Sequence, residues 1–105
     1  MTTYFFIAAS EKFLTVEEPI QEILKERERN YKENKKEIDF WLLKKPLFLK
    51  STQFFDLKAK IPNPPAALIS TDRKFITFLK LRLEFVAVGE FESPSAEITD
   101  PFKVE

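Results

Sequence analysis

The spacing of apolar positions divides the chain into alternating strand-like and helix-like segments. Residues 4–9, 38–43 and 66–70 are short apolar runs, and apolar residues alternate from a changeover at residues 81–84 to about residue 91. Both patterns are typical of strands. Apolar residues at three- and four-residue spacing follow residues 15, 51 and 72, which indicates three helices. The order β-α-β-α-β-α-β predicts an α+β fold with a four-stranded, mostly antiparallel sheet packed with about three helices.

Polar residues mark where the predicted helices begin. Thr15 and Glu18 have the spacing of a capping box, in which a hydroxyl and a carboxylate accept hydrogen bonds from free helix amides. The last helix is expected to begin with Thr71 or Asp72 as its cap. Gly89, near the end of the fourth predicted strand, is expected to mark a bulge or the end of that strand.

The chain has the length of one domain. It contains 105 residues, 44% of them hydrophobic, including 12 phenylalanines. A chain of this size hides roughly 65% of the surface that its unfolded form exposes, which is enough for a core. We expect one α+β domain over residues 1–92. Residues 93–105 hold two prolines and few apolar side chains, so they are predicted to form a loosely ordered C-terminal tail.

Charge and hydropathy exclude several classes of partner. Seventeen basic and seventeen acidic side chains give a net charge of zero, so attraction to nucleic acid or anionic lipid is not expected. No apolar run approaches the roughly 18 residues of a membrane span. The N-terminus lacks the basic segment of a secretory signal. These features predict a protein of a cytosol-like compartment.

The missing residue types limit the possible chemistry. The chain has no cysteine and no histidine, which removes thiolate nucleophiles, the usual general base and the usual metal and haem ligands. One glycine cannot form a phosphate-binding loop. Carboxylates such as Asp39, Glu84 and Glu90 suit Mg²⁺ or Ca²⁺ but lack compact ligand spacing. We therefore expect no enzymatic activity, no metal and no cofactor.

Asp39 and Arg82 are charged residues that stand among large apolar residues in the sequence. In the predicted strand 38–43, Asp39 shares a face with Trp41, while Phe40 points to the opposite face. One interpretation makes Asp39 and Arg82 a buried or half-buried ion pair, or two edge residues that reach water. The other places them near Phe40 and Trp41 as the polar part of a docking surface, because interfaces favour aromatics with arginine. Glu84 competes for Arg82 if both lie in one strand.

The segment of residues 25–37 also has two interpretations. Ten of its thirteen residues are charged, and Tyr31 is its only large apolar side chain. It is either a solvated extension of the first helix or an arm that faces a partner, with Tyr31 as a contact.

Several short segments spread over residues 2–94 form a combined pattern, although none is specific alone. Together they resemble the MgPME-cyclase complex family, which consists of small proteins of cyanobacteria and plastids. The segments are Thr2-Thr3-Tyr4, Leu24-Lys25-Glu26-Arg27, Glu37-Ile38-Asp39-Phe40-Trp41-Leu42, Lys45-Pro46, Phe48-Leu49, Ser70-Thr71, Phe75-Ile76-Thr77, Leu79-Lys80-Leu81-Arg82-Leu83-Glu84 and Gly89-Glu90-Phe91.

This resemblance implies an accessory subunit of the aerobic magnesium-protoporphyrin IX monomethyl ester oxidative cyclase, which builds the fifth ring of chlorophyll. The expected partner is the membrane-associated di-iron catalytic subunit. The expected location is the cyanobacterial cytosol or plastid stroma, peripheral to photosynthetic membranes through that partner. The family's interaction residues correspond to Asp39, Phe40 and Arg82, and with Trp41 they form the expected partner-binding site.

The absence of histidine agrees with a supporting role, because a di-iron centre of this kind needs a carboxylate–histidine cluster. The chemistry would then belong to the partner. Two other functions stay open. One is handling of the tetrapyrrole substrate, for which aromatic side chains are suitable although no axial histidine exists. The other is a small carboxylate-dependent enzyme that uses Asp39 and Glu84.

Overall fold

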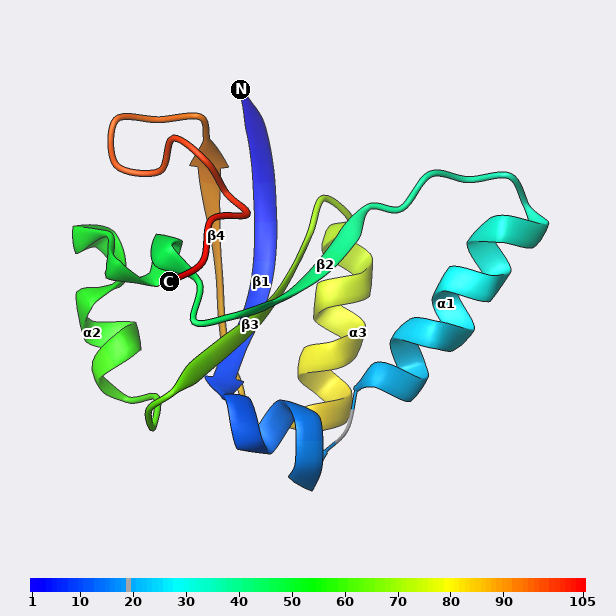
Figure 1. The fold of residues 1–105 in the computed structure, drawn as a ribbon, viewed down its shortest axis with the longest axis horizontal. Coiled ribbons are helices and arrows are strands. Elements are labelled where there is room, and N and C mark those ends of the chain that lie inside the picture. Colours follow the sequence, from blue (N-terminus) through cyan, green and yellow to red (C-terminus); the bar gives the residue numbers. More distant parts are fainter. Residues whose placement is uncertain (19) are drawn as a thin grey trace.

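An antiparallel sheet of four strands organises the molecule (Figure 1). The structure is a computed structural model, and it describes residues 1–18 and 20–105. The strands are β1 (Thr2–Ser10), β2 (Phe40–Lys44), β3 (Pro65–Ser70) and β4 (Ala87–Ser93), in the sheet order β2-β3-β1-β4. All three neighbouring pairs are antiparallel. The predicted α+β fold with a four-stranded antiparallel sheet is confirmed.

In the part of the chain that the structure describes, three α-helices cover the two faces of the sheet. Helices α1 (Gln21–Glu33) and α3 (Arg73–Leu83) lie on one side, while α2 (Phe55–Ala59) and the C-terminal segment lie on the other (Figure 1). The turns Phe13–Glu17, Leu47–Lys50 and Thr52–Phe54 are short π- or 3₁₀-helical segments. Within the described residues, no helix has both the length and the apolar character needed to cross a bilayer.

The central strand β1 supplies both cores because its successive side chains point to opposite faces. Ile7 and Ala9 enter the core under α1 and α3. Phe6 and Ala8 enter the core on the α2 side. The apolar runs 4–9 and 66–70 therefore correspond to the central strands β1 and β3, covered on both faces, whereas the run 38–43 corresponds to β2 at an edge of the sheet.

The first helix begins later than predicted. The Thr15 hydroxyl donates to the backbone carbonyl of Glu11 at 2.7 Å, inside the π-helical turn, and caps no helix. Helix α1 starts at Gln21 without a side-chain cap. The prediction of a capping box at Thr15 and Glu18 is wrong, because the hydroxyl bonds to the preceding turn. Pro19, which the sequence predicts in the first turn of that helix, lies outside the described residues.

The end of α3 changes the placement of two predicted site residues. The helix continues to Leu83, so Arg82 belongs to a helix and not to a strand. Glu84 follows with a left-handed φ of 60°, and the Phe85 amide donates to the Leu83 carbonyl at 2.6 Å. This is a tight γ-turn that redirects the chain into β4. The interpretation in which Arg82 and Glu84 share a strand face is therefore wrong.

Gly89 lies in the regular part of β4, paired with Phe6 of β1. A Cβ atom at this position would lie 2.7 Å from the Phe6 ring, closer than real Cβ atoms approach their neighbours. The expected bulge or strand end at Gly89 is wrong. Glycine is required there because the Phe6 ring fills the space above its Cα atom.

The C-terminal segment is packed, contrary to the predicted loosely ordered tail. Ile98 is buried in the α2-side core, and its carbonyl accepts a hydrogen bond from the Ser93 hydroxyl at 2.7 Å. Backbone hydrogen bonds join Leu47 to Lys103 at 2.9 Å and Glu105 to Lys45 at 3.0 Å. The segment after β4 therefore closes one side of the α2-side core. The composition of residues 93–105 did not predict this packing.

Candidate functional site

A groove between α1 and α3, here called the α1–α3 groove, is lined by one predicted site residue, Arg82, and by Tyr31, which Asp39 and Phe40 contact. The two helices run in opposite directions side by side (Figure 1). The groove has a volume of about 620 Å³. It is lined by Glu22, Ile23, Glu26, Arg27, Asn30 and Tyr31 of α1 and by Phe75, Phe78 and Arg82 of α3.

The α1 wall is formed by residues one helical turn apart. Ile23, Arg27 and Tyr31 follow one another at i, i+4 and i+8, so they project from the same side of the helix. Ile23 is partly buried against the core, and Tyr31 is 5% exposed. Tyr31 and the half-buried Arg27 therefore belong to the packed face of α1, while the other residues of 25–37 are exposed, so the interpretation as a solvated extension of the helix holds except at these two positions.

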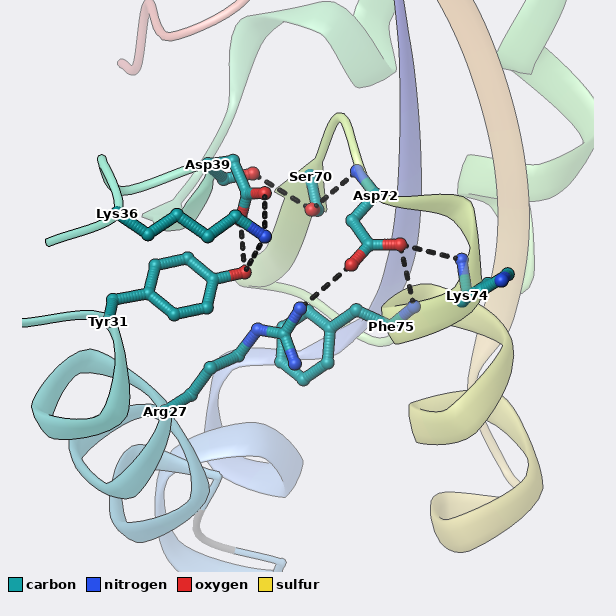
Figure 2. A network of polar contacts seen from close by, with 8 residues as sticks. All are labelled: Arg27, Tyr31, Lys36, Asp39, Ser70, Asp72, Lys74 and Phe75. Atoms are coloured by element: carbon teal, nitrogen blue, oxygen red, sulfur yellow. Dashed lines mark hydrogen bonds and ion pairs between the residues drawn. The ribbon is translucent and has the colours of Figure 1, made fainter. Parts of the chain in front are cut away.

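Asp39 holds Tyr31 in place from the segment before β2. Its Oδ1 accepts a hydrogen bond from the Tyr31 hydroxyl at 2.8 Å, and its Oδ2 lies 3.7 Å from the Lys36 ammonium (Figure 2). The Asp39 backbone carbonyl accepts a hydrogen bond from the Ser70 hydroxyl at 2.8 Å, which fixes the segment to the end of β3. The carboxylate therefore orients a groove residue. The predicted ion pair with Arg82 does not form; Lys36 is its charged partner.

The titration behaviour of this cluster favours the same arrangement at neutral pH. Burial raises the pKa of the Tyr31 phenol, and the hydrogen bond to Asp39 raises it further. Tyr31 therefore stays protonated and remains the donor. The hydrogen bond with Tyr31 is the main cause that raises the pKa of Lys36. Lys36 therefore stays charged, with its ammonium 4.6 Å from the centroid of the Tyr31 ring.

Phe40 supports the groove from below. Its side chain is 6% exposed, and its ring meets Tyr31 and Phe75 edge to face, with centroids 5.6 and 5.7 Å apart. Both neighbours line the groove. Phe40 therefore presents almost no surface of its own and acts by positioning two aromatic rings that do.

Trp41 lies away from this region. It packs in the α2-side core, with its ring 4.6 Å from Phe102 and 6.4 Å from Tyr4. Successive strand residues point to opposite faces, so the neighbour of Phe40 cannot share its side of the sheet. The structure thus separates Trp41 from the other three predicted site residues.

Arg27 is a groove residue that the sequence did not single out. Its guanidinium lies 3.8 Å from the Phe75 ring centroid and forms an ion pair with Asp72 at 2.9 Å (Figure 2). Asp72 also accepts hydrogen bonds from the Lys74 and Phe75 amides as the cap of α3, as predicted. The Arg27 contact thus ties α1 to the start of α3. The i, i+4 spacing of Ile23, Arg27 and Tyr31 could have identified Arg27 as part of the packed face of the helix, but most of its neighbours in the sequence are also charged.

Arg82 is exposed on the α3 wall of the groove, across from Glu22 and Glu26. Within residues 1–18 and 20–105 its guanidinium forms no ion pair within 4.0 Å. A guanidinium with five N–H donors is therefore available beside aromatic side chains.

The carboxylates considered for metal binding or hydrolysis do not meet. Asp39 lies beside Tyr31, whereas Glu84 follows α3 and Glu90 lies in β4. In the part of the chain that the structure describes, no group of three or more acidic, histidine or cysteine residues is placed to hold a metal ion. What the α1–α3 groove offers is aromatic surface, hydrogen-bond donors and charge, which suit noncovalent binding.

Comparison with known proteins gives one consistent family. The family described as "Ycf54 protein" matches residues 2–93. The Ycf54-like protein of Synechocystis sp. PCC 6803 is 52% identical over 101 residues, covering 96% of this chain and 76% of that protein. The chloroplastic protein YCF54 of Arabidopsis thaliana is 41% identical over 97 residues, covering 91% of this chain and 45% of that protein. The chain is thus similar to cyanobacterial and chloroplast proteins.

Solved structures show the same fold. The crystal structure of the All0216 protein from Nostoc sp. PCC 7120 superposes with a TM-score of 0.95 at 55% identity, covering 98% of this chain and 95% of that one. The Ycf54 protein of Synechocystis sp. PCC 6803 superposes with a TM-score of 0.94 at 49% identity, covering 99% and 97% of the two chains.

Proposed function

Because this chain belongs to the Ycf54 protein family, we propose that it is a non-catalytic accessory subunit of the aerobic magnesium-protoporphyrin IX monomethyl ester cyclase. It binds the di-iron catalytic subunit of that enzyme and supports its accumulation. One observation carries the proposal. The residues expected from the family resemblance lie in two parts of the chain and meet at the α1–α3 groove, which Arg82 lines and which Asp39 and Phe40 reach through their contacts with Tyr31.

The three residues have different roles in this proposal. Arg82 contacts the partner directly, because it is exposed and has no ion-pair partner in the described chain. Asp39 acts through Tyr31, because its carboxylate accepts a hydrogen bond from the Tyr31 hydroxyl at 2.8 Å. Phe40 acts through Tyr31 and Phe75, which rest on its ring. Asp39 and Phe40 are therefore positioning residues for the surface that meets the partner.

The physical character of the groove supports protein binding. Interface energy concentrates in aromatic and arginine side chains, and both line this groove. Tyr31 and Arg27 are held by hydrogen bonds and ring contacts before any partner arrives. Such preorganisation reduces the conformational entropy that binding would otherwise cost. Trp41, on the other side of the sheet, is left out of the proposed binding surface.

The relatives come from cyanobacteria and chloroplasts. We place the protein in the cyanobacterial cytosol or plastid stroma, next to photosynthetic membranes through its partner. Fractionation of the native host with and without the catalytic subunit tests this location. The protein is expected in the membrane fraction only when the subunit is present. Membrane association that persists without the subunit would contradict it.

Capture of the catalytic subunit by the tagged protein tests the function itself. Arg82→Ala is expected to weaken capture at least tenfold, which corresponds to about 1.4 kcal/mol. Arg73→Ala is the matched control, since Arg73 is an exposed arginine on the same helix outside the groove lining. Equal capture by the wild type and Arg82→Ala would reject the site. Failure of the wild type to capture the subunit would reject the function.

The positioning roles need variants that keep the fold. Phe40→Ala removes a buried ring, which typically costs 3–5 kcal/mol, so it tests folding as much as binding. Phe40→Leu preserves most of the volume and removes the edge-to-face contacts with Tyr31 and Phe75. We expect Phe40→Leu and Tyr31→Phe to fold, as judged by circular dichroism, and to capture less catalytic subunit than the wild type.

A further inference from the structure

Helix α3 exposes a row of large apolar side chains beside the α1–α3 groove. Phe78 is 50% exposed, Leu81 is 74% exposed, and Phe85, just after the helix, is 83% exposed. Phe78 and Leu81 are three residues apart and project from the same side of α3, whereas Phe85 follows the turn at Glu84 and is not part of that helical face. Single exposed apolar residues are ordinary, but neighbouring ones beside a groove suit an interaction surface. We call Phe78 and Leu81 the α3 apolar row.

The two sides of this surface carry opposite charge. From Arg73 to Leu83, α3 contains four basic residues and no acidic residue, and Lys74 and Arg82 are exposed on it. The opposite wall on α1 presents the exposed side chains of Glu22 and Glu26, while Arg27 on that wall is partly buried and paired with Asp72. Glu26 pairs with Arg29, but both side chains are about two thirds exposed, so this pair holds the carboxylate only weakly.

From this geometry, and resting on the function proposed above, we infer that the groove and the α3 apolar row accept one amphipathic helix of the catalytic subunit. The apolar face of that helix lies on Phe78 and Leu81. Its flank facing α3 carries acidic residues, which meet Lys74 and Arg82. Its flank facing α1 carries basic residues, which meet Glu22 and Glu26. The opposite charges of the two walls also select one direction for the docked helix, since reversing it would exchange the flanks.

The shape of the surface favours a helix over an extended strand. The α1 wall extends from Glu22 to Tyr31, a rise of nine residues or about 14 Å at 1.5 Å per residue, which matches two to three turns of a third helix. A helix satisfies its own backbone hydrogen bonds, whereas a strand laid on two walls of side chains would leave its amides and carbonyls unpaired. Three helices in contact also permit ordinary ridge-into-groove packing at 8–10 Å between axes.

Charge argues against the two other occupants. Anionic lipid headgroups would be attracted by Lys74 and Arg82 but repelled by Glu22 and Glu26 on the facing wall. A second copy that met this one α3 against α3 would oppose two helices with four basic residues and no acid each. Like charges across an interface oppose association. A helix with one acidic and one basic flank is repelled by neither wall of the groove.

The first test compares exposed apolar residues on the two sides of the sheet. Phe78→Ser and Leu81→Ser are expected to weaken capture of the catalytic subunit at least tenfold, since each removes apolar contact area. Phe55→Ser is the matched control, because Phe55 is 76% exposed on α2, on the opposite side of the sheet. It is expected to bind like the wild type. All three side chains are at least half exposed, so the fold is expected to survive.

This comparison separates failure of the inference from failure of the proposed function. If Arg82→Ala loses capture while Phe78→Ser and Leu81→Ser retain it, the helix-binding inference is overturned and the accessory function stands. If the wild type captures no catalytic subunit, the function falls and the inference falls with it. Glu22→Lys combined with Glu26→Lys is expected to weaken capture at least fivefold. Unchanged capture by that variant would overturn the assigned charge pattern.

Photo-crosslinking identifies the shape of the occupant. A photoreactive residue placed at Phe78 or Leu81 is expected to attach to one segment of the catalytic subunit, at positions three, four or seven residues apart. Attachment at every second residue would indicate a strand and overturn the inference. Leu81-dependent binding of the wild type to vesicles of phosphatidylglycerol, or Leu81-dependent dimers in light scattering, would assign the surface to lipid or to a second copy instead.

Discussion

Tyr31 is the residue through which several neighbours act. Its ring packs edge to face against Phe40, and its hydroxyl donates a hydrogen bond to Asp39. The Arg27 guanidinium lies 5.0 Å from the centroid of its ring. In the sequence it is the only large apolar residue of a charged segment, so its importance depends on contacts with residues distant in the chain. A local pattern identifies Tyr31 as a candidate contact but not as the centre of this cluster.

The hydrogen bond between Tyr31 and Asp39 is expected to show as an energetic coupling. Tyr31→Phe, Asp39→Ala and the double variant form a cycle whose free energies of unfolding can be measured with urea. We expect a coupling of about 1 kcal/mol, because each single variant already removes the bond between the two groups. Additive effects of the two single variants would show that the bond contributes nothing to stability.

Gly89 is expected to tolerate no side chain. Gly89→Ala would place a Cβ atom 2.7 Å from the Phe6 ring, and Phe6 is fully buried, so the ring has no free space to move into. Overpacking of this kind costs about 1–3 kcal/mol in unfolding free energy. Phe6→Leu in the Gly89→Ala background should recover part of that cost, measured by urea denaturation. A wild-type stability for Gly89→Ala would contradict this account.

At the scale of the element, α3 depends on Asp72 in two ways. The carboxylate accepts hydrogen bonds from the amides of Lys74 and Phe75, and it pairs with Arg27 of α1 at 2.9 Å. Asp72→Ala removes both the cap and the ion pair, while Asp72→Asn keeps a capping oxygen and removes the charge. One residue therefore fixes both the start of α3 and the position of the groove wall on α1.

These two variants separate capping from pairing. Loss of a helix cap typically costs about 1 kcal/mol, so Asp72→Ala is expected to unfold at a lower urea concentration than Asp72→Asn. Asp72→Asn should in turn be less stable than the wild type, and high salt should reduce that difference because the pair is partly exposed. Equal stability of the two variants would mean that the cap contributes nothing.

The contrast between Asp72 and Thr15 shows how far local patterns determine element boundaries. Asp72 precedes a strongly periodic apolar segment, and it caps α3 as the sequence predicts. Thr15 has the same kind of signal, but its hydroxyl bonds back to Glu11. At the end of α3, apolar residues at 79, 81, 83 and 85 fit an alternating pattern as well as a helix, so the assignment of Arg82 to α3 was not available from spacing.

At the scale of the whole molecule, the sequence reveals the sheet more fully than the site. Central strands can be predicted from apolar runs in the sequence, because both of their faces are buried. The site depends instead on how two helices lie together. Asp39, Phe40 and Arg82 could be marked by resemblance, but their division into positioning and contact residues follows from burial and from the hydroxyl of Tyr31. Ile98 and Phe102 were likewise hidden in a segment of polar composition.

The C-terminal segment gives the molecule a pH-dependent contact. Glu97 accepts hydrogen bonds from the hydroxyls of Thr52 and Ser51, and these bonds lower the pKa of its carboxyl group. A group whose pKa is lowered by folding stabilises the fold above its unfolded pKa, near 4.5, and this contribution is lost as pH falls through the lower folded value. Neutral pH therefore favours closure of the segment over residues 51–52.

Glu97→Gln is accordingly expected to be less stable than the wild type at pH 7, with the difference shrinking as pH falls below about 4.5. Trp41 is a suitable reporter during urea unfolding, because it is the only tryptophan and packs against Phe102 of this segment. Ser51→Ala combined with Thr52→Val removes both donors. In that background Glu97→Gln should lose its pH-dependent effect. An effect that persists there, or one that grows toward acid pH, would show that these two hydroxyls do not hold the carboxylate.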